Sequence, residues 1–248
     1  MNYSVNKGDD LMQRFMLCFL LSAFAGTLRA EEPVKYFPVR NVQTNEISYY
    51  KIGPKVPFFE DGLDQWTDTK GNPVSDGWQV NDGTLSRVQA AGDIISKKEY
   101  EYFVLEFEWS IVERGNSGIK YRVRKFGNDY LGCEYQLFDD LDNNDKQNTA
   151  SLYDVYAPNK GKLLKPVGEF NHSKIVVLGE RIEHWLNGER VLLVYSGTPD
   201  WQAHITNSKF NETKGFGESG KGKILIQDHG SAVHLKNMTI QEFHLVTN

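Results

Sequence analysis

The sequence predicts an all-β fold, a sandwich of two antiparallel sheets, and three observations support this. Short segments whose side chains alternate with period two follow one another through most of the chain. Turn-forming pairs such as Asp61-Gly62 and Asn187-Gly188 separate these segments at regular spacing, as in hairpins. Aromatic residues make up 12% of the 248 residues, which is typical of β-structure. We find no internal repeat or linker, and therefore expect one sandwich domain over residues 58–248.

The first thirty residues have the features of a signal peptide. Arg14 precedes an apolar run over residues 15–27, and Ala30 is the small residue that a signal peptidase requires. The apolar run is too short to span a membrane. The polar residues before Met12 are unusual for a signal peptide, so Met12 is an alternative start to Met1. We expect cleavage near Ala30 and a secreted or periplasmic protein with no stable membrane anchor.

The order of the elements can be predicted along the chain. Residues 31–57 are rich in proline and should form an extended lead-in with one strand at 47–52. The most regular strand is expected over 102–113, where Phe103, Leu105, Phe107, Trp109 and Ile111 share one face. One short helix is expected within 200–212. Further strands are expected over 78–80, 84–88, 174–178, 181–186 and 190–195, and a closing pair over 223–227 and 232–243.

Residues 116–140 carry the densest set of polar side chains and should form two strands joined by the turn-formers 127–129. In the first strand Lys120, Arg122 and Arg124 are expected on one face. In the second, Glu134, Gln136 and Asp140 should lie opposite the side of Cys133, Tyr135 and Leu137. Arg122, Glu134 and Gln136 on adjacent strands would make a binding floor. A cross-strand ion pair between Arg122 and Glu134 without any function would give the same pattern.

Charge and motifs exclude several classes of protein. The net charge is −5 and the pI is about 5.7, so nucleic acid is not an expected partner. The sequence contains no GxSxG motif, no phosphate-binding glycine loop of the GxxxxGK[ST] type and no HExxH motif. The acidic residues over 139–145 lack the spacing of a calcium loop and indicate a solvated loop. Cleavage near Ala30 would remove Cys18 and leave Cys133 alone, so no intrachain disulfide is expected.

His229 is the histidine with the most informative setting. It follows a predicted strand, shares a face with Gln227, and precedes Gly230, which allows a sharp turn. A histidine at such a position can act as an acid, a base or an electrophile near neutral pH. An isolated surface histidine without a role is the alternative interpretation.

Seven segments of the chain form an ordered set: FFEDGLDQW, WQVNDGTLSR, GDIISKKEYEYFVLEFEW, GNSGIKYR, GCEYQLFDD, HWLNGERV and GKILIQDHGSAVHLKNMTI. Together they resemble the 3-keto-disaccharide hydrolase family, and the resemblance runs from Phe58 to Phe243. It implies a concanavalin A-like jelly roll and a secreted bacterial protein that acts on sugars. Two segments depart from the family pattern, Thr149-Ala150-Ser151-Leu152-Tyr153 and Lys236-Asn237, and they bear on the substrate rather than on the fold.

The resemblance implies cleavage of a glycoside that has been oxidised to a ketone at C3. The ketone makes the C2 proton acidic, a base removes it, the enolate expels the C1 substituent, and water adds to the unsaturated sugar. In this scheme Arg122 would stabilise the ketone or enolate oxygen, Glu134 would act as general base or acid, and His229 would carry out the complementary proton transfer. A divalent metal ion bound by Glu134 and His229 is the alternative electrophile. The expected substrate-binding residues are Lys120, Gln136, Asp140, Tyr153 and Gln227.

Two other functions remain open at this point. A non-catalytic carbohydrate-binding module, a lectin, would use the same fold and the same polar and aromatic floor. It would tolerate loss of the proton chemistry of Glu134 and His229. An ordinary endoglucanase would need two spaced carboxylates on one strand face, as in ExDxxE, and the sequence contains no such pattern. The identity of the glycoside and the oligomeric state are left open.

Overall fold

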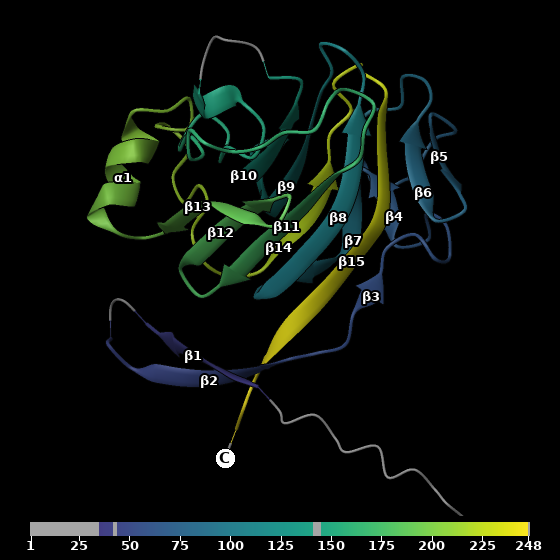
Figure 1. Cartoon of the computed structure of the whole chain (residues 1–248). Helices are drawn as coiled ribbons and strands as arrows, with labels where there is room; N and C mark the ends of the chain where they lie inside the picture. Colours follow the sequence, from purple (N-terminus) through teal and green to yellow (C-terminus); the bar gives the residue numbers. More distant parts are fainter. Residues whose placement is uncertain (1–34, 42–43, 141–144, 248) are drawn as a thin grey trace, which may run out of the picture. The chain divides into compact units, whose positions relative to one another are not determined.

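The computed structural model describes residues 35–41, 44–140 and 145–247, and the predicted signal peptide lies outside them (Figure 1). Two antiparallel sheets dominate this part of the chain, which confirms the predicted all-β jelly-roll sandwich. The described residues also contain the helix α1 (Pro199–Thr206) and the 3₁₀ helix η1 (Asp145–Gln147). No helix among them is long and apolar enough to cross a membrane.

In the described part of the chain, the larger sheet has ten strands, and its central path runs β1-β2-β15-β8-β11-β12-β13. Strands β3 and β6 pair with β15, and β5 pairs with β6. The strands are β1 (Tyr36–Arg40), β2 (Ile47–Ile52), β3 (Val56–Pro57), β5 (Trp78–Asn81), β6 (Thr84–Arg87), β8 (Phe103–Ile111), β11 (Asn171–Leu178), β12 (Arg181–Leu186), β13 (Glu189–Tyr195) and β15 (Val233–Leu245).

The smaller sheet carries the candidate site. Its order is β10-β9-β14-β7-β4, so the hairpin of β9 and β10 lies at one edge and β14 pairs with β9. The strands are β4 (Trp66–Asp68), β7 (Ile94–Tyr100), β9 (Asn116–Phe126), β10 (Asp129–Phe138) and β14 (Gly222–Ile226). The turn at Gly127 and Asn128 joins β9 to β10, as the sequence predicts.

The core contains side chains from both sheets. Phe107 of β8 packs edge-on against Tyr135 of β10, with ring centroids 5.7 Å apart. The Tyr135 hydroxyl lies 2.7 Å from Ser173 Oγ, and Trp109 Nε1 donates to the same oxygen at 2.9 Å. A fully buried apolar side chain contributes about 1.5–3 kcal/mol, and these hydrogen bonds avoid the cost of burying polar atoms without partners. Cys133, a free thiol, is fully buried in this core.

Several sequence predictions are confirmed. The strand β8 buries the five predicted residues on one face, and Asn187-Gly188 forms the turn between β12 and β13. The strand predicted at 47–52 is β2, which pairs with β15. The prediction of one strand in the lead-in is wrong, because β1 pairs with β2 and β3 pairs with β15. The short helix expected within 200–212 is α1, which follows a Thr198 cap, begins one residue earlier than expected and ends at Thr206.

One predicted pairing is wrong. The last two strands, β14 and β15, were expected to form a pair, but they lie in different sheets. The segment 227–232 between them crosses from the smaller sheet, where β14 pairs with β9, to the larger sheet, where β15 pairs with β8. Asp228 holds it to the loop before β7. This crossing places the end of β14 beside the candidate site.

Candidate functional site

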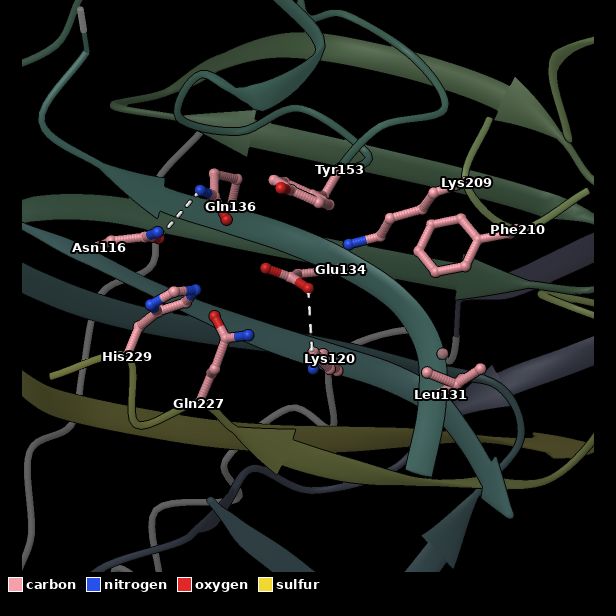
Figure 2. Close-up of a pocket in the computed structure, with 11 residues that line it drawn as sticks. Asn116, Lys120, Leu131, Glu134, Gln136, Tyr153, Lys209, Phe210, Gln227 and His229 are labelled. Atoms are coloured by element: carbon pink, nitrogen blue, oxygen red, sulfur yellow. Dashed lines mark hydrogen bonds and ion pairs between the residues drawn. The ribbon is translucent and has the colours of Figure 1, made fainter. Parts of the chain in front are cut away.

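A polar pocket of about 470 Å³, including its open mouth, lies on the smaller sheet (Figure 2). Its floor comes from β9 and β10, on the face opposite the core residues Tyr121 and Tyr135. One end is formed by residues that follow β14, and a loop wall comes from Tyr153, Lys209 and Phe210. The described lining residues are Asn116, Lys120, Leu131, Gly132, Glu134, Gln136, Tyr153, Lys209, Phe210, Gln227 and His229.

Glu134 occupies the middle of the floor. It faces Lys120 directly across the β9–β10 ladder, and Lys120 Nζ lies 4.0 Å from Glu134 Oε2. The Glu134 side chain is only 6% exposed. Burial raises the pKa of Glu134 to about 7, although the ammonium groups of Lys120 and Lys209 act to lower it. The result is a carboxyl group that can gain or lose a proton near neutral pH.

Gly118 makes room for this carboxyl group. A Cβ atom at Gly118 would lie 2.5 Å from Glu134 Oε1, a distance that real side chains do not tolerate. Gln136 flanks the group on the same strand. Its Nε2 donates to Asn116 Oδ1 at 3.1 Å. In the other orientation of the amide, with its oxygen and nitrogen exchanged, the nitrogen donates to Glu134 Oε1 at 2.9 Å. The amide therefore links Glu134 to the polar end of the pocket.

Gln227 and His229 form the polar end. The backbone N–H of Gln227 donates to Gly118 O at 3.0 Å, which extends the β14–β9 ladder by one residue. The side-chain oxygen of Gln227 is buried and accepts no hydrogen bond from any described residue. A sugar hydroxyl in the pocket would supply the missing donor.

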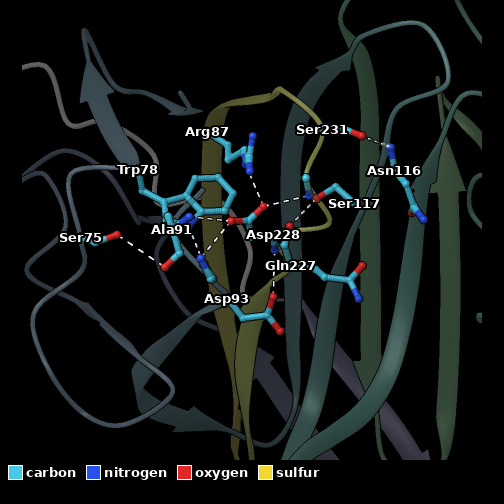
Figure 3. Close-up of polar contacts among 12 residues, drawn as sticks. Ser75, Trp78, Arg87, Ala91, Asp93, Asn116, Ser117, Gln227, Asp228 and Ser231 are labelled. Atoms are coloured by element: carbon cyan, nitrogen blue, oxygen red, sulfur yellow. Dashed lines mark hydrogen bonds and ion pairs between the residues drawn. The ribbon is translucent and has the colours of Figure 1, made fainter. Parts of the chain in front are cut away.

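Asp228, between these two residues, ties the segment to the loop that precedes β7 (Figure 3). Its own N–H donates to Asp93 Oδ1 at 2.9 Å. Burial acts to raise the pKa of Asp228, but the hydrogen bonds that its carboxylate accepts outweigh burial and lower the pKa to about 2. The Asp228 carboxylate accepts hydrogen bonds from Arg87 Nε (2.8 Å) and from the backbone N–H groups of Ala91 (2.8 Å), Gly92 (2.9 Å) and Gly230 (3.0 Å).

Tyr153 and Lys209 form the loop wall and come from two separate loops. The Lys209 ammonium lies 4.2 Å from the centroid of the Tyr153 ring and 5.1 Å from that of Phe210. The backbone N–H of Lys209 donates to Asp154 Oδ2 at 2.7 Å and so joins the loops. Figure 2 shows the Lys209 ammonium pointing toward Glu134.

The predicted position of Arg122 is wrong. Arg122 and Val123 together oppose the single residue Gly132, which is a β-bulge, and Arg122 has a φ of 52°. The bulge turns the Arg122 side chain away from the pocket and into the interior, where it is 2% exposed. Glu134 therefore faces Lys120 rather than Arg122. The guanidinium donates to Ser196 Oγ (2.9 Å), Gly217 O (2.9 Å) and Gly179 O (2.5 Å).

Asp140, which the sequence predicts to bind substrate, does not line the pocket. The strand β10 ends at Phe138, and side chains after this residue no longer alternate between the two faces of the sheet. Asp140 accepts a hydrogen bond from the backbone N–H of Thr149 at 2.6 Å and forms an ion pair with Lys162.

The structure brings together six of the predicted residues in one pocket: Lys120, Glu134, Gln136, Tyr153, Gln227 and His229. Five further lining residues were not predicted from the sequence: Asn116, Leu131, Gly132, Lys209 and Phe210. Asn116 begins the polar stretch and could have been found by extending its alternation. Lys209 and Phe210 follow the helix in a segment without periodicity, so no sequence pattern connects them to the floor.

The pocket does not fit a divalent metal ion. Among the described residues, no group of three or more His, Cys, Asp or Glu side chains is placed to hold one. Glu134 and His229 are the side chains of this kind that line the pocket. The ammonium groups of Lys120 and Lys209 lie in the same pocket and would repel a cation there.

The described residues form an antiparallel β-sandwich that carries a polar pocket on its smaller sheet. The model of the family described as the 3-keto-alpha-glucoside-1,2-lyase-like domain matches residues 54–241, and the chain belongs to this family. This confirms the family resemblance noted in the sequence.

Two relatives support the assignment. The chain is 32% identical over 211 residues to the 3-keto-disaccharide hydrolase of Bacteroides thetaiotaomicron, with 73% of this chain and 68% of that protein covered. It is 33% identical to a protein of Parabacteroides distasonis ATCC 8503 that is named provisionally as a glycosyl hydrolase. That crystal structure superposes with a TM-score of 0.69 and covers 77% of this chain and 94% of its own.

Proposed function

We propose that this protein is an enzyme that cleaves glycosides carrying a ketone at C3 of the sugar. Family membership and the name of the Bacteroides relative support the substrate class. The observation that carries the proposal is Glu134, a buried carboxyl group in the middle of a polar pocket, with a pKa of about 7. Such a group can take a proton from carbon C2, whose acidity the neighbouring ketone provides.

The proposed reaction is an elimination followed by addition of water. Glu134 removes the C2 proton, and the electron pair moves toward the C3 oxygen. The C1–O bond then breaks as the C3 carbonyl re-forms, and the departing oxygen takes a proton from His229. Water adds its hydroxyl to C1 and a proton to C2 of the enone, which completes a net hydrolysis. Gln136 and Gln227 would hold sugar hydroxyls, and Lys120 would help to keep Glu134 ionised.

The pocket favours this route over an ordinary glycosidase mechanism. Retaining and inverting glycosidases use two carboxyl groups on the two sides of the bond that breaks. Among the described residues that line the pocket, Glu134 is the only carboxylic acid. An elimination needs a single base, because the ketone supplies the activation.

The test compares 3-keto-glucosides with the parent glucosides, using a chain that starts at Glu31. We expect turnover of the keto-sugars alone, a transient ultraviolet absorbance from the enone, and release of 3-ketoglucose. Glu134→Gln should lower kcat/KM by about 100-fold to 10,000-fold, as expected for a lost general base. EDTA should have no effect, because the pocket does not fit a metal ion.

A lectin of the same fold is the second candidate, and the unpartnered oxygen of Gln227 is the observation in its favour. Saturable sugar binding without turnover of either class of sugar would establish the lectin and refute the enzyme. Equal cleavage of parent and keto-sugars would refute the elimination route.

We also propose that the protein is exported after cleavage near Ala30. The composition of the first thirty residues supports this. In a bacterial host that secretes the full chain, sequencing of the mature N-terminus should give Glu31 as the first residue. A protein retained in the cytoplasm with its first thirty residues intact would contradict the proposal.

A further inference from the structure

The pocket contains two lysines, and they differ in what they contact. Lys120 lies on the floor, 4.0 Å from the carboxylate of Glu134, and forms an ion pair with it. Lys209 comes from the loop wall, and its ammonium contacts only the faces of Tyr153 and Phe210. The Lys209 ammonium forms no hydrogen bond or ion pair with any described residue, so its three N–H donors are available to a ligand.

The charges in the pocket point to a ligand that becomes negative. Lys120 and Lys209 place two ammonium groups around Glu134, the only carboxylic acid among the described lining residues. With Glu134 ionised, the pocket retains one positive charge, although the whole chain has a net charge of −5. When Glu134 takes up a proton, the positive charge of the pocket increases. A negative charge that develops on the substrate at that moment would therefore be stabilised.

An enolate formed next to a ketone is such a charge. Its oxygen lies in the plane of the carbonyl group, whereas the base approaches C2 from above or below that plane. The group that binds the oxygen must therefore approach from a different direction than the base. Figure 2 shows Lys120 and Lys209 on different sides of Glu134, with Lys209 reaching in from the loop wall.

We propose that Lys209 binds the C3 oxygen of the substrate and stabilises the negative charge that develops on it as Glu134 removes the C2 proton. This proposal rests on the function proposed above. The C2–H bond breaks, its proton moves to Glu134, and its electron pair forms the C2–C3 double bond of the enolate. The C3 oxygen becomes negative and accepts a hydrogen bond from the Lys209 ammonium. Stabilisation of the enolate oxygen is the role that the sequence predicts for Arg122.

The test uses Lys209→Met, which keeps an apolar side chain over the Tyr153 ring and removes the charge. Exchange of the substrate C2 proton with solvent deuterium reports enolate formation directly, whether or not the glycosidic bond breaks. We expect the exchange rate and kcat/KM to fall by about 100-fold, the typical effect of losing one donor to a developing oxyanion. Lys209→Arg should restore part of both.

A matched control is available on the other sheet. Lys174 of β11 also places its ammonium over an aromatic ring, 4.0 Å from the centroid of Trp185, and it does not line the pocket. Lys174→Met should leave deuterium exchange and kcat/KM unchanged.

The pH profile separates a catalytic role from a structural one. The Lys209 charge lowers the pKa of Glu134, so its removal should move the acid limb of kcat/KM to higher pH. Exchange within twofold of the wild-type rate in Lys209→Met, with the acid limb unmoved, would overturn the role of Lys209 and leave the proposed function intact. Absence of exchange and turnover in the wild-type chain would instead refute the proposed function itself.

Discussion

Glu134 affects the stability of the fold, because its surroundings favour the uncharged carboxyl group. The pKa rises from an ordinary 4.5 to about 7 in the folded chain. The unfolded chain therefore releases this proton at lower pH than the folded chain, and stability falls as the pH rises from about 4.5 to 7. Above pH 7 the loss is complete and constant.

Glu134→Gln should remove this loss. We expect the variant to unfold at a higher temperature than the wild type at pH 8, and at nearly the same temperature at pH 4.5. The difference corresponds to roughly 2–3 kcal/mol, or about 4–10 °C in Tm for a chain of this size. Thermal unfolding of both proteins across this pH range measures it. A Tm difference that does not vary with pH would contradict the assigned pKa.

Arg122 should prove structural rather than catalytic. Its guanidinium donates to three oxygens of the interior, and Arg122→Met would leave those acceptors without partners. We expect a loss of about 2–4 kcal/mol, or roughly 5–15 °C in Tm, while kcat/KM at 20 °C stays within about fivefold. Calorimetry and steady-state kinetics on one preparation test this. A loss of activity with an unchanged Tm would contradict this and indicate that Arg122 takes part in the reaction.

At the scale of the element, the hairpin of β9 and β10 shows how far alternation can be used. Lys120 and Glu134 were placed correctly, because the register between the strands is regular from Asn116 to Tyr121. Beyond Tyr121 the two residues Arg122 and Val123 oppose Gly132 alone. A Cβ atom at Gly132 would lie 2.5 Å from Tyr121 O, so the bulge depends on a close backbone contact that side-chain pattern does not report.

Two residues of the loop wall, Lys209 and Phe210, could not be predicted from the sequence, and the reason differs from that for Arg122. Lys209 and Tyr153 are far apart in the sequence, and they meet because Asp154 accepts a hydrogen bond from the Lys209 backbone. Such a contact depends on how two irregular segments pack, and neither segment has a period. The family, six lining residues including Tyr153, and the strands other than β1, β3, β4 and β7 followed from the sequence, whereas Lys209 and Phe210 required the structure.

The segment after β14 gives a prediction at the same scale. Asp228 holds Gln227 and His229 in place through four hydrogen bonds to its carboxylate. Asp228→Asn would lose the ion pair with Arg87 and at least one acceptor. We expect kcat/KM to fall by about tenfold, because a small displacement of catalytic groups has a large effect on rate.

Asp68→Asn is the control for this variant. Asp68 also accepts backbone N–H bonds within a turn, from Lys70 and Asn72, but it does not line the pocket. It should leave kcat/KM unchanged. Equal kinetic effects of the two substitutions would show that Asp228 has no particular role in placing its neighbours.

At the scale of the whole chain, the first two strands lie outside the matched family domain, which begins at residue 54. The hairpin of β1 and β2 pairs with the end of β15 and adds ring contacts, Phe37 with Phe243 at 5.2 Å and Tyr50 with Tyr102 at 5.3 Å. None of these residues lines the pocket.

A chain that starts at Gly53 should therefore keep its kinetics and lose stability. We expect kcat/KM within twofold of the value for a chain that starts at Glu31. Tm should be lower by several degrees, because the truncation removes ring contacts worth about 0.5–1.5 kcal/mol each and the apolar area that they bury. A large change in KM would show that the hairpin contributes to substrate binding.

Cys133 lies directly behind the floor of the pocket and is completely buried. Burial also raises the pKa of its thiol to about 11, so very little thiolate exists at neutral pH. In a chain that starts at Glu31 it is the single cysteine. A thiol-specific dye can therefore react only when the β9–β10 hairpin leaves the core. The rate of labelling measures how fast this hairpin opens. The same position protects the thiol from oxidation and from forming disulfide-linked dimers.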